Sequence, residues 1–363
     1  MSAPTIGVEE EFFLVDADGL PMPVSRAVLS RLDGATSDHT QHELQRSQIE
    51  TETSVCRTLA DVNFELRQRR RDVAKAAGAV GARLASSGSL PTGPPAQPQV
   101  TPKRAYIELE RDYQQLTREQ HVCGCHVHIG IDDPELAIDV LNRSRPWLPA
   151  VLALSTNSPF WDGVDTGYAS YRHEVWSRWP VSGIPEPFSS RADYEDAVSA
   201  LVDTGAVDAS ARLYWDVRPS ARYPTLEFRV ADACLTVEDT LVLAGVIRAL
   251  VMTCAEEAGR GVPASARRYE LVRAAAWRAA RYGLGADLID VAGRQAAPAR
   301  DVVDAFLAHL RPALESAGDW QLVAAGVTRM FDQGTGAVRQ RKAFSERGRT
   351  EDVVDFIVEQ TAA

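Results

Sequence analysis

The stretch HVCGCHVHIG, residues 121–130, alternates imidazole and glycine positions with small apolar ones. Successive side chains of a β-strand point to opposite faces of its sheet. In a strand over this stretch, His126 and His128 would therefore share one face. The opposite face would carry Cys123, Cys125, Val127 and Ile129. The stretch thus predicts a strand with one apolar face and one face that bears imidazoles.

Cysteine and histidine lie so close together here that a zinc site or a cysteine nucleophile must be considered. Zinc sites usually need C-x-x-C spacing or ligands that converge on one face, whereas these cysteines and the two histidines point opposite ways. Cys123 and Cys125 alternate with valine and isoleucine, so we predict that they are small core residues; a nucleophilic role is the alternative. The five cysteines, an odd number, also argue against a disulfide framework.

Working outward, three further segments show the same alternation: IGVEEEFFLV (6–15), QIETETSV (48–55) and PTLEFRVAD (224–232). Their polar faces carry Glu9 with Glu11, Glu50 with Glu52, and Glu227 with Arg229. The opposite faces are mainly apolar. The exception is Glu10, which we expect to pair with an arginine or to lie at an exposed edge.

If these four strands belong to one sheet, their polar faces bring up to five carboxylates and an imidazole together. Carboxylates packed side by side repel one another, and divalent cations would relieve that repulsion. Oxygen ligands with a minor imidazole contribution suit Mg²⁺ or Mn²⁺ better than Zn²⁺. The alternative is a half-exposed sheet whose charges simply lie in water.

The order of the patterns along the chain predicts the fold class. Strands scattered among loops come first, and helical patterns dominate from Val237 onward, which is typical of an α+β fold with a largely antiparallel sheet. The chain has no G-x-G-x-x-G after a strand and no G-x-x-x-x-G-K-[ST]. We expect a long helix over 58–86, and a helical segment from Asp133 that Pro146 and Pro149 divide. No repeat or linker stands out, so we predict one domain over residues 1–363.

Composition and charge exclude some classes of protein. The net charge is −11 and the pI is about 5.2, whereas a nucleic-acid binder usually shows a basic stripe. We interpret the run RQRRR, Arg67 to Arg71, as a solvated helix face. The N-terminus lacks a signal-peptide pattern, and the most apolar helical segment is too short for a membrane and contains Arg248. We expect a cytoplasmic protein that binds neither nucleic acid nor membrane; a homo-oligomer stays open.

Six separated motifs resemble a known family. They are GVEEEFFLVD, QIETETSV, CGCHVHIG, ALSTNSPFWDGVDTGYASYR, WDVRPSARYPTLEFRVAD and GTGAVRQR. In this order they resemble the bacterial carboxylate–amine ligases of the glutamate–cysteine ligase type, in the short-chain group 2, over nearly the whole chain. The resemblance implies a fold similar to that of glutamine synthetase: an antiparallel sheet bent into a funnel and flanked by helices, with ATP and Mg²⁺ on its concave polar face.

The resemblance also implies roles for individual residues. Those implied for the metal are Glu9, Glu11, Glu50, His126 and Glu227. His126 is implied to contact the nucleotide as well, with His128 beside it, and Arg229 is implied as a partner for phosphate or the substrate carboxylate. The chemistry needs further arginines: the catalytic candidates are Arg172 and Arg218, and the candidates for binding the cofactor are Arg339 and Arg341. The last two follow a glycine-rich turn whose backbone N–H groups could cradle phosphates. Two departures from the family pattern are Ser54, where proline usually stands, and Cys125, where an aliphatic residue is expected.

The activity that the resemblance implies is ATP-dependent ligation. Such enzymes activate the γ-carboxylate of L-glutamate as an acyl phosphate, which the amine of cysteine or another amino acid attacks to give a γ-glutamyl amide, ADP and phosphate. The residues expected to shape the acceptor pocket are Asn157, Asp165, Tyr168 and Tyr171. Two alternatives stay open: a metal-dependent amide hydrolase that uses the same Glu/His face, and a ligand-binding relative without the reaction.

Overall fold

The computed structural model describes residues 3–95, 97–207, 213–264 and 267–362. Its main feature is a seven-stranded sheet with the order β10-β11-β5-β1-β3-β2, in which β4 pairs with the far end of β1. The strands are β1 (Ile6–Val15), β2 (Thr40–His42), β3 (Gln48–Glu52), β4 (Arg83–Ala85), β5 (Gly124–Gly130), β10 (Val217–Pro219) and β11 (Thr225–Asp232). All their pairings are antiparallel, as predicted.

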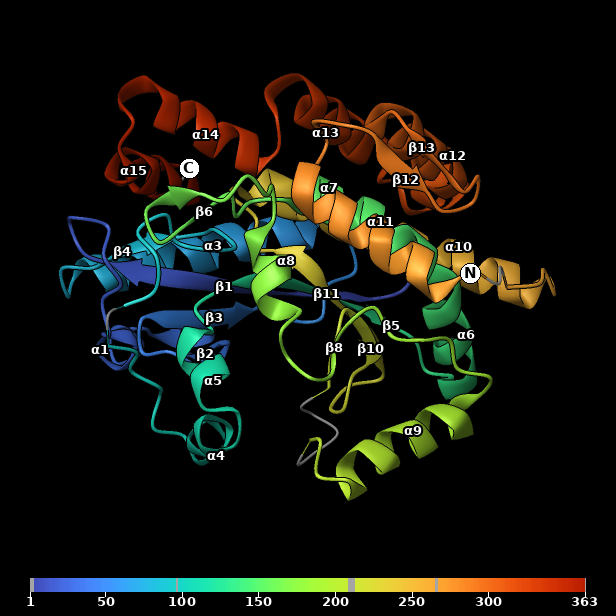
Figure 1. Ribbon diagram of the computed structural model, residues 1–363, viewed down its shortest axis with the longest axis horizontal. Coiled ribbons are helices and arrows are strands. Elements are labelled where there is room, and N and C mark those ends of the chain that lie inside the picture. Colours follow the sequence, from blue (N-terminus) through green and yellow to red (C-terminus); the bar gives the residue numbers. More distant parts are fainter. Residues whose placement is uncertain (1–2, 96, 208–212, 265–266, 363) are drawn as a thin grey trace.

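Helices cover the apolar face of this sheet. That face packs into the largest hydrophobic cluster with α3 (Leu59–Gly78), α6 (Pro134–Ser144), α7 (Leu148–Ser155) and α10 (Val237–Gly259). Behind them lie α11 (Tyr269–Tyr282), α12 (Ala299–Ala317) and α13 (Trp320–Gln333). In the view of Figure 1, α12 and α13 lie at the top with α14 (Gly336–Arg347) and α15 (Thr350–Ala362). The predicted α+β class, an antiparallel sheet flanked by helices, is thereby confirmed.

Short elements make up the rest of the described chain. The helices are α1 (Ser25–Leu29), α2 (Gly34–Asp38), α4 (Arg104–Tyr113), α5 (Gln115–Glu119), η1 (Arg145–Trp147), α8 (Tyr171–Trp176) and α9 (Arg191–Asp203). The two-stranded pairs are β6 (Phe160–Trp161) with β7 (Val164–Asp165), β8 (Ser182–Gly183) with β9 (Tyr214–Trp215), and β12 (Leu288–Asp290) with β13 (Gln295–Ala297). Helices α4, α5 and α9 lie at the bottom of Figure 1, opposite the C-terminal helices.

The strand registers place the acids as alternation predicts. Across β1 and β3, Glu11 lies opposite Glu50, and across β1 and β5, Glu9 lies opposite His126. Glu227 of β11 lies opposite His128. Every second residue of these strands therefore faces the side of the sheet that the main helices do not cover.

The back face of β1 holds a buried ion pair that corrects one prediction. Arg70 of α3 binds both carboxylate oxygens of Glu10, at 3.0 and 2.7 Å, and both side chains are about 2% exposed or less. Arg69 is buried too and donates to the carbonyl of Glu52. The interpretation of 67–71 as a solvated helix face is therefore wrong at Arg69 and Arg70, because a buried acid and free carbonyls face them. The expectation that Glu10 pairs with an arginine is confirmed.

Helix α3 is shorter than expected. It begins at a capping box, in which Thr58 and Asp61 accept each other's backbone N–H, but it ends at Gly78 rather than near 86. The residues that follow turn back so that Arg83–Ala85 can pair with the end of β1, and strand pairing there outweighs helix propensity. The proline division is as expected, since η1 separates α6 from α7. Within the described ranges, no helix has both the length and the apolar character that crossing a membrane requires.

Candidate active site

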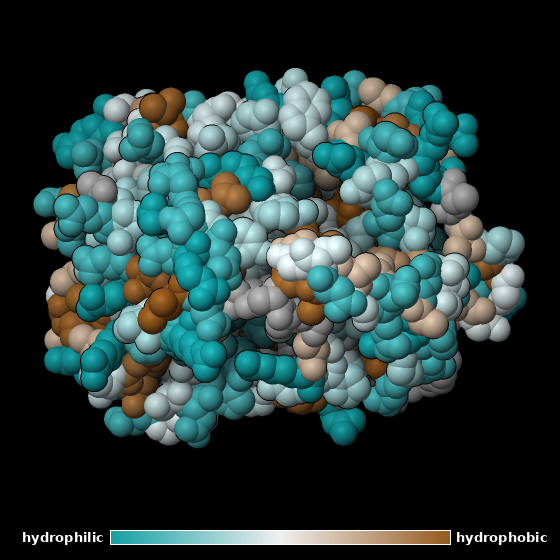
Figure 2. Space-filling view, turned by 60° about the horizontal axis from the view of Figure 1, so that its bottom comes forward, coloured by the Kyte–Doolittle hydropathy of each residue, from teal (hydrophilic) through white to brown (hydrophobic). Residues whose placement is uncertain are grey.

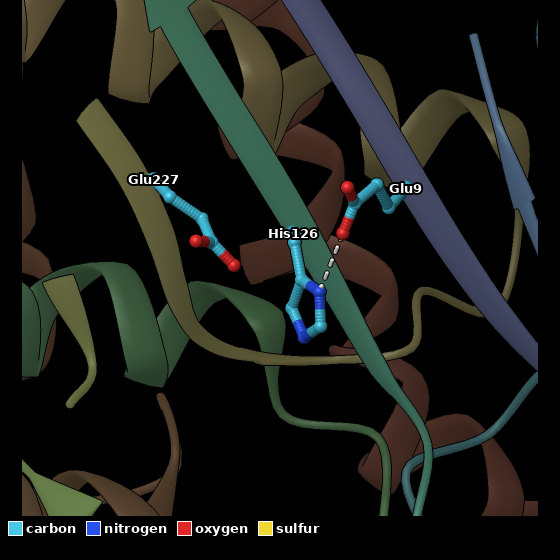
Figure 3. Close-up of side chains that lie close together, drawn as sticks. All are labelled: Glu9, His126 and Glu227. Atoms are coloured by element: carbon cyan, nitrogen blue, oxygen red, sulfur yellow. Dashed lines mark hydrogen bonds and ion pairs between the residues drawn. The ribbon is translucent and has the colours of Figure 1, made fainter. Parts of the chain in front are cut away.

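Three neighbouring strands bring Glu9, His126 and Glu227 together on the polar face of the sheet (Figure 3). One ligand atom from each lies within 4.8 Å of the others. A second group of the same kind joins Glu11, Glu50 and the same histidine. All five residues predicted to bind metal thus form two clusters that share His126.

The environment of His126 suits a metal ligand. Its Nδ1 lies 3.0 Å from Glu9 Oε2, closer than the 3.4 Å to an Nη of Arg229. Burial, and then the charge of Arg229, lower the pKa of His126 to about 4, so the ring is neutral and donates Nδ1–H to Glu9. Its Nε2 is then a lone-pair nitrogen, buried without a hydrogen-bond partner and 3.6 Å from Glu11 Oε1. A carboxylate that orients a histidine from behind is common in metal sites.

The carboxylates on this face do not ionise easily together. Burial, and then the charge of Glu43, raise the pKa of Glu11 to about 8. Burial and the charges of Glu9 and Glu43 raise the pKa of Glu50 well above its usual value. Glu9 differs: burial opposes its ionisation, but hydrogen bonds from His126 and His128 hold its pKa well below the usual value. A divalent cation would offset the mutual repulsion, so the donor set fits Mg²⁺ or Mn²⁺.

Arginines lie directly beside the acids. Arg229 forms an ion pair with Glu227, and Arg218 binds the same carboxylate at 2.9 Å. Arg172, at the start of α8, is 3% exposed and donates to the carbonyl of Arg229 at 3.2 Å. The guanidinium groups of Arg172 and Arg229 lie 5.6 and 5.8 Å from the centre of the Trp176 ring. The three arginines predicted near the reacting groups are therefore together in the structure.

Gly124 makes room for this arrangement. A β-carbon at this position would lie 2.4 Å from an Nη of Arg172 and 3.1 Å from His126 Nε2. Its N–H also donates to Glu11 at 2.6 Å. The glycine between the two cysteines of the opening stretch is thus required by close approach of a charged side chain.

Two cavities border the clusters on either side. The first, which we call the arginine cavity, has a volume of about 150 Å³ and includes Glu11, Glu50, His126, Arg172 and Arg229 in its lining. The second, which we call the apolar cavity, has a volume of about 300 Å³. Its lining includes Ile6, Val8, Glu9, Glu52, Val55, His128 and Tyr223. The acids and histidines therefore separate a charged cavity from a mainly apolar one.

Sequence reasoning missed several polar residues of the arginine cavity, among them Glu43, Gln48 and Gln120. Glu43 lies in it, and burial raises its pKa. Glu43 directly follows β2, a short strand that the sequence analysis did not predict, so strand alternation was not applied to it. Gln48 lies there too; its Nε2 donates to the Val122 carbonyl at 2.8 Å, and its Oε1 has no partner. Gln48 shares a face with Glu50, so alternation could have found it.

Several predicted residues lie away from both cavities. Arg339 pairs with Asp239 of α10, and Arg341 binds Asp165 at 2.7 Å. Both arginines belong to helix α14 rather than to the glycine-rich turn, and neither lines the arginine cavity or the apolar cavity. The structure therefore does not bring them to the acids, and their phosphate contact stays a prediction. Asn157, Asp165, Tyr168 and Tyr171 also line neither cavity, and their part in an acceptor pocket stays a prediction.

The long loop instead holds Arg172 in place through a buried acid. Asp232 accepts hydrogen bonds from Asn157 N at 2.8 Å, Ser158 Oγ at 2.7 Å and Ser170 Oγ at 2.7 Å. Ser158 Oγ in turn accepts from the N–H of Arg172 at 3.0 Å. The bulge between Phe228 and Ala231 brings Asp232 opposite Gly124, on the polar face, where simple alternation would not have placed it.

The cysteines of the opening stretch are core residues in the structure. Cys123 and Cys125 are fully buried. A contact with Cys234, and then burial, raise the pKa of the Cys125 thiol well above its usual value, and burial does the same for Cys123. A thiol is nucleophilic only as the thiolate, so neither is set up as a nucleophile.

Cys125→Ala is expected to lower the free energy of unfolding by about 1 kcal/mol, as small buried deletions do, and to leave turnover unchanged. Denaturant unfolding and a ligation assay test this, with Cys254→Ala in α10, also buried, as the matched control. Loss of turnover in a folded Cys125→Ala protein, but not in the control, would overturn the packing role.

Acids around one histidine, with arginines beside them on an antiparallel sheet, form the arrangement that the resemblance to carboxylate–amine ligases implied. Comparison with known families identifies the protein further. The model described as glutamate-cysteine ligase family 2 matches residues 5–359. The chain belongs to this family and is a ligase, as its motifs predicted.

Relatives of known name are similar over almost the whole chain. A protein of Frankia alni named "Putative glutamate--cysteine ligase 2-2" is 43% identical and covers 98% of this chain and 97% of its own length. A protein of Rhodopirellula baltica named "Putative glutamate--cysteine ligase 2" is 42% identical, and the match covers 99% of this chain and 97% of that protein.

Solved structures confirm the fold at low identity. Glutamate–cysteine ligase of Francisella tularensis, in complex with AMP, aligns with a TM-score of 0.76 at 11% identity over all of this chain and 90% of that one. A bifunctional glutathione synthetase of Pasteurella multocida aligns with a TM-score of 0.74 at 19% identity. This chain spans about half of that protein, 52% of its length. At such identities the likeness concerns the fold alone.

Proposed function

We propose that the protein uses ATP to join the γ-carboxylate of L-glutamate to an amine. The γ-carboxylate oxygen attacks the γ-phosphorus of ATP, ADP leaves, and an acyl phosphate forms. The amine nitrogen then attacks the acyl carbon, phosphate leaves, and the nitrogen gives up its extra proton. The observation that supports this best is the pair of carboxylate clusters around His126, with Arg172 and Arg229 at the adjoining cavity.

The acids would hold the metal. Glu11, Glu50 and the Nε2 of His126 make one ligand set, and Glu9 and Glu227 contribute to the other; Glu43 lies close enough to Glu11 and Glu50 to affect both of their pKa values. Bound Mg²⁺ would neutralise charge on the ATP phosphates as the two anions approach.

The arginines and the two cavities would position the substrates. A guanidinium fork suits carboxylate and phosphate because it donates two parallel hydrogen bonds, so we assign glutamate to the arginine cavity. Nε of Arg172 and Nε of Arg229 are buried without partners, which leaves donors for an anion. We assign the nucleotide base to the apolar cavity, whose mainly apolar lining suits a flat ring and which the acids separate from the arginines.

A coupled assay of ADP release tests the proposal. We expect release that requires L-glutamate, a divalent cation and an amine, with a γ-glutamyl amide identified by mass. Amide cleavage without nucleotide would instead show a hydrolase, and a binding protein would release no ADP with any substrate combination.

Stability in the absence of metal is expected to fall as the pH rises from about 5 to 8. Glu11 has a pKa of about 8 in the folded protein against a usual value near 4.5, so the folded state binds its proton more tightly. The contribution of protonated Glu11 to the free energy of unfolding is therefore fully present below pH 4.5. It is lost as the pH approaches 8. A cation needs the ionised carboxylates, so its affinity rises over the same range.

Millimolar Mg²⁺ or Mn²⁺ should therefore raise the melting temperature by roughly 3–5 °C at pH 8 and by much less at pH 5.5. Sodium chloride at equal ionic strength is the control. An equal rise at both pH values, or the same rise with sodium chloride, would contradict binding at these carboxylates.

A further inference from the structure

We propose that the acceptor amine carries a bulky apolar side chain, which binds between α4 and the Trp176–Trp179 segment. This inference rests on the proposed ligase function and concerns the part of the arginine cavity that the glutamate carboxylates and the metal ligands do not explain.

The lining of the arginine cavity has two chemically different parts. The charged part consists of Glu11, Glu43, Glu50, His126, Arg172 and Arg229. The other part, which we call the aromatic wall, consists of Leu44, Tyr106, Leu109, Trp176, Trp179 and Tyr214. The two parts touch, since the Trp176 ring lies 5.6 and 5.8 Å from the guanidinium groups of Arg172 and Arg229. A ligand in this cavity would therefore meet a mainly carbon surface beside charged groups.

The aromatic wall is not part of the main hydrophobic core. Leu44, Leu109 and Trp179 form a separate small cluster, with Tyr106 and Tyr214 packed against it. Val100, Tyr113 and Leu116 also pack against this cluster, without lining the cavity. An apolar cluster that borders a cavity beside charged groups provides a binding surface for an apolar group.

The indole N–H groups of the wall and the Tyr106 hydroxyl have hydrogen-bond partners within the protein. Trp179 Nε1 donates to Gln120 Oε1 at 2.7 Å, and Trp176 Nε1 donates to the Tyr214 carbonyl at 3.1 Å. The hydroxyl of Tyr106 donates to Glu43 at 3.3 Å. The indole N–H groups are thus satisfied, and the rings offer their faces and carbon edges to the cavity.

This wall disfavours a charged or strongly polar acceptor side chain. Such a side chain would lose its hydration against indole and leucine carbon. The indole N–H groups already have partners, so they would not replace the lost hydrogen bonds. An apolar side chain gains affinity there, about fourfold for each buried methylene group. Leucine, methionine and phenylalanine are acceptors of the expected kind.

The first measurement separates activation from acceptance. Hydroxylamine is a small nucleophile that attacks an acyl phosphate without needing the aromatic wall. Formation of γ-glutamyl hydroxamate from glutamate and ATP therefore reports the proposed function alone. ADP release is then measured with glutamate fixed and with L-leucine, L-methionine, L-phenylalanine, L-cysteine, L-aspartate or L-lysine as acceptor.

The second measurement uses Leu109→Ala, with Leu116→Ala as the matched control. Both truncate a leucine of the same cluster, but only Leu109 lines the cavity. We expect Leu109→Ala to lower kcat/KM for the preferred apolar acceptor by about tenfold or more, and to lower the rate of hydroxamate formation by much less. Leu116→Ala should leave both reactions unchanged.

Higher kcat/KM for leucine, methionine or phenylalanine than for the other acceptors, together with the selective effect of Leu109→Ala, supports the inference. Hydroxamate formation combined with a preference for cysteine, aspartate or lysine overturns the inference and leaves the ligase function standing. Equal effects of the two leucine variants also overturn it. Absence of hydroxamate overturns the proposed function, and the inference with it.

Discussion

Glu50→Gln is expected to lower kcat for ligation by about a thousandfold and to leave the fold intact. Glu50 lies opposite Glu11 in the β1–β3 register and belongs to the cluster that shares His126. A carboxamide keeps the size of the side chain, but it lacks the negative charge that holds a divalent cation.

The stability of this variant distinguishes a functional loss from a structural one. Burial and neighbouring acids raise the pKa of Glu50 well above its usual value, so its charged form is disfavoured in the folded protein. Glu50→Gln should therefore melt at the same temperature as the parent or higher. Glu315→Gln, on the exposed side of α12, is the control. Full turnover in Glu50→Gln, or turnover lost together with the fold, would refute the metal-site assignment.

Arg70→Met is expected to lower the free energy of unfolding by about 3–5 kcal/mol. It removes the partner of Glu10 and leaves that carboxylate buried. It also removes the donors that the Cys234 and Leu235 carbonyls accept from, at 2.9 and 3.1 Å. Urea unfolding at neutral pH measures the loss.

Two further variants make the result specific. Arg71→Met, next along the same helix but exposed, should change stability by less than about 0.5 kcal/mol. Glu10→Leu combined with Arg70→Met should recover much of the loss, because an apolar pair replaces a buried charge without a partner. Equal losses in Arg70→Met and Arg71→Met would show that the Glu10 pair does not stabilise the protein.

Much of the candidate site could be predicted from strand alternation. Because side chains alternate strictly along a strand, the residue numbers alone sorted the acids and His126 onto one face and Cys125 onto the other. The same rule singled out Glu10, and the structure shows the arginine that it needs. The roles of these residues in catalysis stay predictions, as does the single domain over 1–363.

Other parts of the site could not be read from local patterns. Glu43 directly follows β2, a strand of three residues that is too short to stand out as an alternating pattern. Arg70 belongs to a run of arginines typical of an exposed helix face, and only the packing of α3 on β1 shows that it is buried. Arg339 and Arg341 matched a family motif, yet their carboxylate partners come from segments far away in the chain.

The amino-acid sequence by itself determined the fold class, the family and the face on which the acids and histidines predicted for the site lie. These properties follow from local periodicity and from the order of the motifs. Neither depends on which strands become neighbours in the sheet. Only the tertiary structure decided which charges meet: that Glu10 pairs with Arg70, that Asp232 reaches the polar face through a bulge, and that an aromatic wall faces the acids. The physical reason is that burial and ion pairing depend on distances between segments remote in the chain. The alternation of side chains along one strand does not contain those distances.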